Sequence, residues 1–540
     1  NNSNNSNNSN NSNKQTIKMA TRQRFGLCDG LERLQYEKKD QVCLVYKGKE
    51  ETFGEIWEIT QRLSSAFQTE LGLKIGDVVS ISSPNCPEFV HCLAALDRVG
   101  AVCLPIPHML TSEEMEIIVS EFQPKVLFLH ESQIEKFSKI QGALPYKPRV
   151  FSYSGDTFEK YDELIKKGDS KEFTKVEVTE NDLQLVMLTS GTTGHPKGVM
   201  KTYREMFDAC TLWASKSGGM ASIILYNSLA WIGGNGIMWL LFLSGLKVIL
   251  MDGYHKEEYI DLIIEHKVQA AFLLPQPFFD FSQLPDETVK KLCETVKVLI
   301  FGGGNISPAA IEGCLKKFEG CVLNNSYGMT EGGFVSGIIQ TPVNLKPENR
   351  HLLTSVGKLG MGVHVQITDE EGKEVPIGES GEILIRSSSV TTGYFRNPEA
   401  TAKAFRNGWF CTGDAGMMDK EGNLYIQDRI KDVVKTPEGY NIFPIEIETI
   451  LDKHDDIGTS AVIGVPRADG NGEILVACMV KKGEKEHTPE DLTKYCEEHV
   501  AKYKVPKFFL YFDEFTYNRN NKVDKRKMRG RALETGKVVV

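Results

Sequence analysis

One short segment of the sequence gathers residue types that bind phosphate. It reads LTSGTTGHPKGV, runs from Leu188 to Val199, and follows the apolar run LQLVML. Its glycines let the backbone approach a ligand closely, and main-chain N–H groups, hydroxyls and one ammonium can together hold a polyphosphate. The spacing is not that of a Walker A loop, and a plain surface loop is the alternative. The candidate phosphate ligands are Thr189, Ser190, Gly191, Thr192, Thr193, Gly194 and Lys197.

Two further segments place an acid beside glycines. NSYGMTEGG carries Glu331, and a carboxylate suits a hard cation that also binds phosphate oxygens. GWFCTGDAG carries Asp414, and a carboxylate that accepts two hydroxyl donors gives strong, directional recognition. Each segment on its own is more typical of a simple turn. Whether they are functional motifs therefore depends on which other motifs occur in the same chain.

Taken in order, these segments resemble the signature motifs of the adenylate-forming superfamily, which includes acyl-CoA and coumarate–CoA ligases, firefly-type luciferases and the adenylation domains of peptide synthetases. The resemblance extends over nearly the whole chain. It implies an enzyme that uses ATP and Mg²⁺ to join a carboxylic acid to AMP and then transfers the acyl group to the thiol of CoA. The alternatives are a luciferase-like oxygenase, an adenylation enzyme that loads a carrier protein, and a non-catalytic relative that binds acid or nucleotide.

The resemblance also implies roles for individual residues. Tyr327 would lie along the adenine, Gly328 would also contact the nucleotide, and Thr330 would meet a phosphate. Glu331 would bind Mg²⁺, and Asp414 would accept the ribose hydroxyls. The remaining nucleotide contacts that the resemblance implies are Gly302, Gly303, Gly304 and Arg429. The last of the three glycines stands where alanine is usual in the family.

The C-terminal motifs follow the family less closely. DRIKDVVKTPEGYNIFPIEIE resembles the hinge and the segment after it, so Lys431 would be the hinge residue. Gly439 and Tyr440 would then line the tunnel for the pantetheine of CoA. YNRNNKVDKRKMR places Lys522 where the family has the lysine that catalyses adenylation, although Asn521 replaces the usual glycine. A solvated basic run is the alternative for this segment.

The expected wall of the acid pocket departs from the family pattern. Many members carry Phe-His-x-x-Gly where this sequence reads AWIGG, so Trp231 replaces the histidine. An indole makes the wall larger and more apolar. We therefore expect a fatty or aryl acid as the substrate, and the sequence does not choose between them.

The elements that must position these motifs alternate between strands and helices. Asp77–Ser82 reads as a strand, Pro87–Gly100 as a helix closed by a glycine, and Ala101–Ile106 as the next strand. This is a βαβ unit, which predicts a parallel, doubly wound sheet. After Leu353 apolar and polar residues alternate on either side of a turn, which indicates antiparallel strands. We predict an α/β fold with a large N-terminal domain of doubly wound sheets, a β-barrel-like subdomain, and a small mobile α+β C-terminal domain.

A chain of 540 residues requires more than one domain. We assign 1–17 to a disordered Asn/Ser-rich tail, 24–428 to the N-terminal AMP-binding domain, 429–432 to the hinge and 433–540 to the C-terminal domain. The apolar stretch Ser228–Met251 contains several glycines and a lysine. It therefore predicts buried core, as a loop, a short helix and a strand, rather than a transmembrane segment.

Composition limits the partners and the compartment. A formal net charge of −9 argues against a nucleic-acid binder. The 12 cysteines are scattered without a Cys-x-x-Cys pair, as expected for buried thiols in a reducing compartment. The final GKVVV is not a Ser-Lys-Leu peroxisomal address, so we expect a cytoplasmic or organelle-associated protein. Its expected partners are a small carboxylic acid, ATP and CoA, and its oligomeric state is left open.

Overall fold

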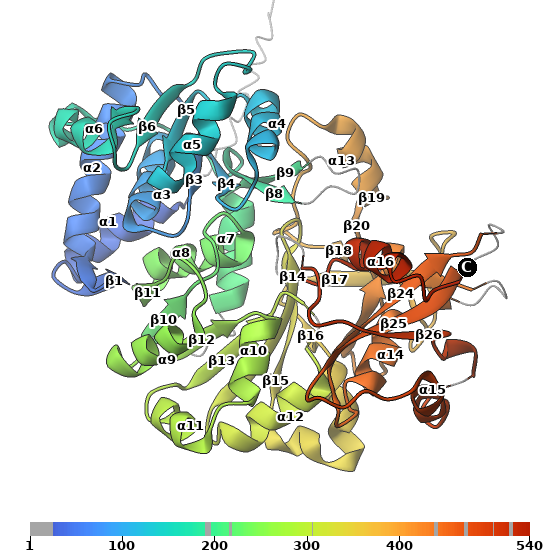
Figure 1. Cartoon of the computed structure of the whole chain (residues 1–540). Helices are drawn as coiled ribbons and strands as arrows, with labels where there is room; N and C mark the ends of the chain where they lie inside the picture. Colours follow the sequence, from blue (N-terminus) through green and yellow to red (C-terminus); the bar gives the residue numbers. More distant parts are fainter. Residues whose placement is uncertain are drawn as a thin grey trace, which may run out of the picture.

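The computed structural model describes residues 25–189, 196–214, 219–304, 306–436, 441–468, 473–500, 502–517 and 522–539. The segment 1–17, predicted to be a disordered tail, lies outside these ranges. The described chain has the predicted α/β architecture, with two large, mainly parallel sheets followed by smaller antiparallel and mixed sheets. Figure 1 shows the C-terminal strands and helices on one side of the molecule, next to the strands that precede them in the chain.

The first sheet contains the predicted βαβ unit. Its strands are β3 (Val78–Ser83), β4 (Val102–Pro107), β5 (Val126–Leu129), β6 (Arg149–Ser152), β7 (Glu159–Lys160), β8 (Leu183–Thr189) and β9 (Lys197–Thr202). They lie in the order β7-β6-β5-β3-β4-β8-β9, and β9 alone is antiparallel to its neighbour. The crossover from β3 to β4 is α3 (Pro87–Val99), which ends where Gly100 takes a φ of +73°.

The second sheet brings the predicted site segments to one edge. Its strands are β1 (Val42–Tyr46), β2 (Lys49–Thr52), β10 (Ser222–Leu225), β11 (Lys247–Leu250), β12 (Ala270–Leu273), β13 (Val298–Gly302), β14 (Val322–Met329), β15 (Gly333–Gln340) and β16 (Lys358–Leu359). The order is β16-β15-β14-β13-β12-β10-β11-β1-β2, with parallel pairing from β14 to β1. The carboxyl ends of β10, β12, β13 and β14 therefore meet at the edge where doubly wound sheets bind ligands.

Helices pack around these two sheets. They are α1 (Leu27–Glu37), α2 (Phe53–Thr69), α4 (Ser112–Phe122), α5 (Glu131–Ile140), α6 (Tyr161–Lys167), α7 (Tyr203–Ala214), α8 (Ile232–Ser244), α9 (Lys256–Glu265), α10 (Pro275–Ser282), α11 (Asp286–Cys293) and α12 (Pro308–Lys317). Short 3-10 turns occur at η1 (Ser170–Glu172), η2 (Pro342–Leu345), η3 (Pro347–Thr354) and η5 (Lys502–Lys504).

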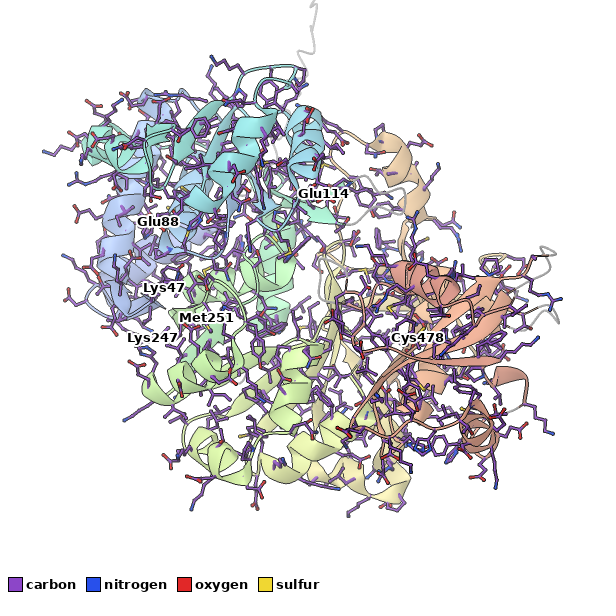
Figure 2. The ribbon with its side chains drawn as sticks, in the orientation of Figure 1. Lys47, Glu88, Glu114, Lys247, Met251 and Cys478 are labelled. Atoms are coloured by element: carbon purple, nitrogen blue, oxygen red, sulfur yellow. The ribbon has the colours of Figure 1, made fainter. Side chains whose placement is uncertain are left out.

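The apolar stretch Ser228–Met251 forms a loop, α8 and β11, as predicted. The helix differs from the prediction in one respect, because its glycines lie inside it. A Cβ on Gly234 would lie 2.3 Å from the carbonyl oxygen of Ser228, so the close approach of the preceding loop explains the missing side chain. Within the described ranges, no helix has both the length and the apolar character that crossing a bilayer requires. Figure 2 labels Lys247, the first residue of β11, and Met251, which directly follows the strand.

An antiparallel sheet follows, where the sequence predicts a barrel-like subdomain. It contains β17 (His364–Thr368), β18 (Gly381–Arg386), β19 (Phe405–Arg406), β20 (Trp409–Met418) and β21 (Leu424–Arg429), with α13 (Pro398–Ala404) before β19. The strand β20 pairs with β18, β19 and β21. Ile383, Phe410 and Leu424 form part of its core.

The C-terminal part has a sheet and cores of its own. Its strands are β22 (Val434–Lys435), β23 (Asn441–Ile442), β24 (Ile457–Pro466), β25 (Glu473–Lys481) and β26 (Phe508–Tyr511), and its helices are α14 (Pro444–Leu451), α15 (Pro489–Glu497) and α16 (Lys525–Glu534). One cluster includes Leu451, Met479 and Leu492. Another includes Cys478 and Met528, and Figure 2 labels Cys478 in this sheet. Mixed pairing with helices gives the predicted α+β character.

Candidate active site

The glycine turn after β13 lies at the carboxyl edge of the second sheet. A Cβ on Gly302 would lie 2.4 Å from the carbonyl oxygen of Ser326, and Gly303 has a φ of +76°. A Cβ on Gly328, at the end of β14, would lie 2.5 Å from the carbonyl oxygen of Gly333. At Gly302 and Gly328 a larger residue is excluded because the main chains of neighbouring strands approach too closely, and at Gly303 the positive φ favours glycine.

A buried carboxylate lies beside this turn. Tyr327 donates its hydroxyl hydrogen to Oδ2 of Asp414 at 2.5 Å, and Nε of Arg429 lies 2.8 Å from Oδ1. Arg429 also donates to the carbonyl oxygen of Thr412 at 2.9 Å. Burial raises the pKa of Asp414, while the charges of Arg429 and Lys522 and the Tyr327 hydroxyl lower it. The Asp414 carboxylate is thus held in one orientation by a phenol and a guanidinium.

Lys522 reaches the same edge from the C-terminal part. Its Cε lies 3.7 Å from the point that a Cβ on Gly304 would occupy. The positive charge of its ammonium also lowers the pKa of the Asp414 carboxyl, which burial raises. That same Cβ would lie 2.9 Å from Cγ of Pro275, so a residue larger than glycine would crowd this approach. The structure therefore brings together the lysine, the glycine turn and the buried aspartate that the sequence singles out separately.

A second acidic group occupies the turn between β14 and β15. Thr330 and Glu331 are both half-buried at this turn. Oε1 of Glu331 accepts a hydrogen bond from the hydroxyl of Tyr394 at 3.1 Å. Nζ of Lys197 lies 5.0 Å from the centroid of the Tyr394 ring, and Lys197 pairs with Thr189 across β8 and β9. A carboxylate and an ammonium thus share one tyrosine at the exit of the predicted phosphate loop.

Of the predicted phosphate ligands in that loop, Thr189 and Lys197 are among the described residues. Ser190, Gly191, Thr192, Thr193 and Gly194 lie outside the described residues. The apolar run before the loop forms the strand β8, and the chain continues after Pro196 as a further strand, β9, and not as a helix.

Two residues of this region were not singled out from the sequence. They are Tyr394, which holds Glu331, and Lys201, which is fully buried in β9 and donates to the carbonyl oxygen of Glu331 at 3.0 Å. The only sequence signal for Lys201 is a lysine among the apolar residues of GVMKT. Their partners are distant in the sequence, so local patterns do not reveal these contacts.

The predicted hinge follows directly on β21. Lys431 lies in the 3-10 turn η4 (Ile430–Asp432), whereas Gly439 and Tyr440 lie outside the described residues. Nζ of Lys525 lies 3.2 Å from Oδ2 of Asp428 and 2.9 Å from Oε1 of Glu448. This ion-paired group joins the last strand before the hinge to two helices after it.

Apolar and aromatic side chains gather after β10 and β12. Trp231 is half-buried at the N-cap of α8. The main-chain N–H of Leu274 donates to the hydroxyl of Tyr226 at 2.8 Å. The rings of Trp213 and Phe272 meet edge to face with centroids 6.0 Å apart. These elements end at the same sheet edge as the glycine turn, which is where a pocket for the acid is expected.

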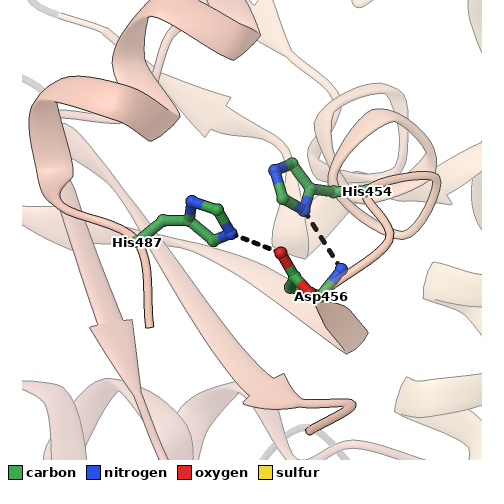
Figure 3. Close-up of side chains that lie close together, drawn as sticks. All are labelled: His454, Asp456 and His487. Atoms are coloured by element: carbon green, nitrogen blue, oxygen red, sulfur yellow. Dashed lines mark hydrogen bonds and ion pairs between the residues drawn. The ribbon is translucent and has the colours of Figure 1, made fainter. Parts of the chain in front are cut away.

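Figure 3 shows a separate polar cluster in the C-terminal part. Nε2 of His487 lies 2.7 Å from Oδ2 of Asp456, and the main-chain N–H of Asp456 donates to Nδ1 of His454 at 3.2 Å. The ammonium of Lys485 lies 3.4 Å from the same Asp456 oxygen. Because this carboxylate already has two cationic or hydrogen-bonding partners, we interpret the cluster as a surface ion-pair network and not as a metal centre.

Comparisons with known proteins agree with this geometry. Residues 31–395 match the family described as AMP-binding enzyme, and residues 446–522 match the AMP-binding enzyme C-terminal domain. The chain is 29% identical over 497 residues to a 2-succinylbenzoate–CoA ligase of Geobacillus sp. (strain WCH70), covering 90% of this chain and 94% of that protein. It is 27% identical over 500 residues to the fatty acid–[acyl-carrier-protein] ligase ScoC of Streptomyces coeruleorubidus, covering 90% and 92%.

Solved structures show the same fold. The ATP-bound structure of MatB from Rhodopseudomonas palustris superposes with a TM-score of 0.83 at 24% identity, covering 94% of this chain and all of that one (100%). At this identity the similarity concerns the fold alone. The family match, in contrast, spans most of the chain and includes the phosphate loop, the glycine turn after β13 and the segment with Glu331. The chain therefore belongs to the AMP-binding enzyme family of adenylate-forming ligases.

Proposed function

We propose that this ligase is an acid–CoA ligase. The carboxylate of the acid attacks the α-phosphate of ATP, which forms an acyl adenylate and releases pyrophosphate. The thiol of CoA then attacks the acyl carbon and AMP leaves. The observation that carries the proposal is the approach of Lys522 to the glycine turn and the Asp414 cluster. Ligases of this family use ATP, Mg²⁺ and CoA.

The nucleotide contacts follow from the contacts of the site. We assign the adenine to the surface of Tyr327 and the glycines Gly302 to Gly304, next to Leu274 and Pro275. Asp414 accepts hydrogen bonds from the ribose hydroxyls, and Arg429 stabilises that carboxylate and the nearby phosphate. Binding of the ribose would give the buried Asp414 carboxylate a function at the edge of the sheet.

The phosphates belong at the other side of the site. Glu331 is a half-buried carboxylate with a fixed neighbour, which suits a magnesium ion that also takes phosphate oxygens. Mg²⁺ would neutralise charge on the phosphates. Thr330, Lys197 and the loop between β8 and β9 contact the pyrophosphate portion, and Lys522 neutralises the charge that develops on the carboxylate and the α-phosphate.

The second half-reaction requires the C-terminal domain to move. We propose that residues 24–428 form the adenylation domain and that 433–540 rotate about Lys431 within the hinge 429–432. Lys522 then leaves the site, and Gly439 and Tyr440 approach to guide CoA. The distinct cores before and after the hinge support this division. The twelve cysteines are all free thiols, which fits a cytoplasmic or organelle-associated enzyme in a reducing compartment.

We further propose that the acid is largely apolar, a medium- to long-chain fatty acid or an aryl-propenoic acid. We assign Trp231, at the start of α8, and the edge-to-face pair of Trp213 and Phe272 to the wall of the acid pocket. Apolar pockets of this kind bind by size and exclude small polar acids.

A carrier protein in place of CoA is the second candidate, because one relative is named a fatty acid–[acyl-carrier-protein] ligase. The test is acid-dependent AMP release with and without CoA. A CoA ligase releases AMP with turnover only when CoA is present. Equal turnover without CoA points to an oxygenase or to simple hydrolysis. A single burst of pyrophosphate, with no further turnover when CoA is added, points to a carrier protein as the acceptor. The absence of acid-dependent pyrophosphate release would refute the adenylation chemistry itself.

A further inference from the structure

A lysine is completely buried beneath the proposed magnesium site. Lys201 lies in β9 and has 0% of its surface exposed. Taking an ammonium out of water costs several kcal/mol unless its hydrogen bonds and its charge are satisfied. The proposed reaction gives Lys201 no contact with a substrate, so its partners must explain why it is there.

Those partners are main-chain oxygens of two functional segments. Nζ of Lys201 donates to the carbonyl oxygen of Glu331 at 3.0 Å and to that of Ser389 at 2.8 Å. The main-chain N–H of Thr391 donates to the same Glu331 oxygen at 2.7 Å. The β14–β15 turn and the segment around residue 389 are therefore tied together at the Lys201 ammonium.

A buried acid compensates the charge. Glu205 is 4% exposed and lies in the first turn of α7, where its carboxylate accepts a hydrogen bond from the N–H of Thr202 at 2.8 Å. Burial lowers the pKa of the Lys201 ammonium, and among the acidic residues Glu205 opposes this lowering most. The pair thus balances charge below the site without presenting either group to solvent.

The same connections reach the Glu331 side chain. Thr391 donates its hydroxyl hydrogen to the carbonyl oxygen of Met200, next to Lys201, at 2.6 Å. Three residues further on, Tyr394 holds the Glu331 carboxylate and lies under the Lys197 ammonium. Main chain and side chain of Glu331 are consequently both fixed relative to β9, the strand that leaves the phosphate loop.

We propose that Lys201 is a positioning residue that sets the geometry of the Glu331 carboxylate against the phosphate loop and thereby sets the affinity for the magnesium–nucleotide complex. This inference rests on the proposed function, because it takes Glu331 as the metal ligand. Partners that orient a metal ligand typically change metal affinity by about 10- to 100-fold when removed.

The test is the double variant Lys201→Met/Glu205→Gln. It removes the ammonium together with its counter-charge, so no unpaired charge is buried. We expect the apparent dissociation constant for free Mg²⁺ in acid-dependent pyrophosphate release to rise about tenfold. Turnover at saturating Mg²⁺ should fall much less, and CoA attack on supplied acyl adenylate should be unchanged. A second variant, Lys201→Gln/Glu205→Gln, keeps an N–H donor and should recover part of the affinity.

Lys317→Met is the matched control, because Lys317 donates to the carbonyl oxygen of Leu284 at 2.7 Å, away from the site. It should leave the Mg²⁺ dependence unchanged. Calorimetric binding of Mg·ATP to the same proteins gives a readout that does not require turnover, so a failure of the proposed reaction is recognised separately. The inference is overturned if folded Lys201 variants bind Mg·ATP and Mg²⁺ as the wild type does. It is also overturned if both half-reactions fall in step with thermal stability, which would indicate a purely structural lysine.

Discussion

At the scale of single residues, the site is built from charged groups whose orientation is fixed before any ligand arrives. Asp414 is held by Tyr327 and Arg429, and Glu331 is held by Tyr394. Preorganised groups of this kind stabilise a transition state without reorganising during the reaction. Lys522 differs from them, because it is exposed and comes from the C-terminal part. This suits a group that must enter and leave.

The first prediction concerns Lys522. Lys522→Ala should lower the rate of acyl-adenylate formation by about 10²–10³, the loss typical of one group that stabilises transition-state charge. The rate at which CoA consumes supplied acyl adenylate should fall far less, and the two rates can be measured separately by pyrophosphate release and thioester formation. Lys527→Ala, at an exposed lysine of α16, is the control and should behave as wild type. Equal losses in both half-reactions would contradict the role given to Lys522.

The second prediction concerns Asp414. Asp414→Ala should weaken ATP binding, because each hydrogen bond from a ribose hydroxyl to this charged acceptor is worth about 1.5–3 kcal/mol. Titration with ATP should show this as a KM at least about tenfold higher. Tyr327→Phe removes one hydroxyl and keeps the ring against the adenine, so its effect should be smaller. An unchanged KM for ATP in Asp414→Ala would remove this residue from the nucleotide site.

At the scale of elements, parallel strands do the positioning. The ends of β12, β13 and β14 carry Leu274, the glycine turn and Tyr327, and Trp231 follows β10 at the start of α8. After the predicted hinge, α14 and α16 are tied to Asp428 through Lys525. The C-cap of the short helix α14 is a half-buried acid, Asp452.

The third prediction follows from Asp452. Burial raises its pKa to about 7, partly opposed by hydrogen bonds from Ser460. Because the folded pKa lies above the unfolded one, the stabilisation is fully present at low pH and is lost as the pH rises through about 7. Asp452→Asn should therefore raise the melting temperature at pH 8 by a few degrees, about 2–4 °C for each kcal/mol.

At pH 5 the effect of Asp452→Asn should be clearly smaller, because the folded carboxyl is then protonated while the unfolded one is ionised, and it should vanish only below the ordinary pKa of an aspartate. Melting curves of both proteins at the two pH values provide the comparison. Asp455→Asn, at an exposed neighbour, should leave the difference between pH values as in the wild type. A stabilisation that is equal at pH 5 and pH 8 would contradict the raised pKa.

At the scale of the whole molecule, local patterns and long-range contacts were predictable to different degrees. The βαβ unit is correct because its signals are local: apolar runs and Gly100 as a helix end. The helix α8 was expected to be shorter, because glycines that permit a close approach read as helix breakers in sequence. The pairing of β1 with β11 joins segments that are distant in the sequence, and so do the contacts of Lys201 and Tyr394. Local sequence patterns therefore cannot predict them.

The fourth prediction concerns the acid. On a panel from acetate to palmitate that includes cinnamate and coumarate, kcat/KM should be highest for an apolar acid, because each buried methylene contributes about 1–3 kcal/mol of discrimination. Trp231→Ala should shift the preference toward bulkier acids. Trp57→Ala, at a buried indole under Arg98 in the first part of the chain, is the control and should not shift the preference. Acetate as the best substrate would refute the apolar pocket.

The central claim is that the acid attacks the α-phosphate of ATP before the acyl group reaches a thiol. Supplying the acid with ¹⁸O in both carboxylate oxygens tests this directly. When CoA displaces AMP from the acyl adenylate, one carboxylate oxygen stays on the phosphate. We therefore predict AMP that carries one ¹⁸O atom, an acyl-CoA that carries the other, and pyrophosphate without label. Unlabelled AMP, or label in inorganic phosphate together with ADP, would contradict the account.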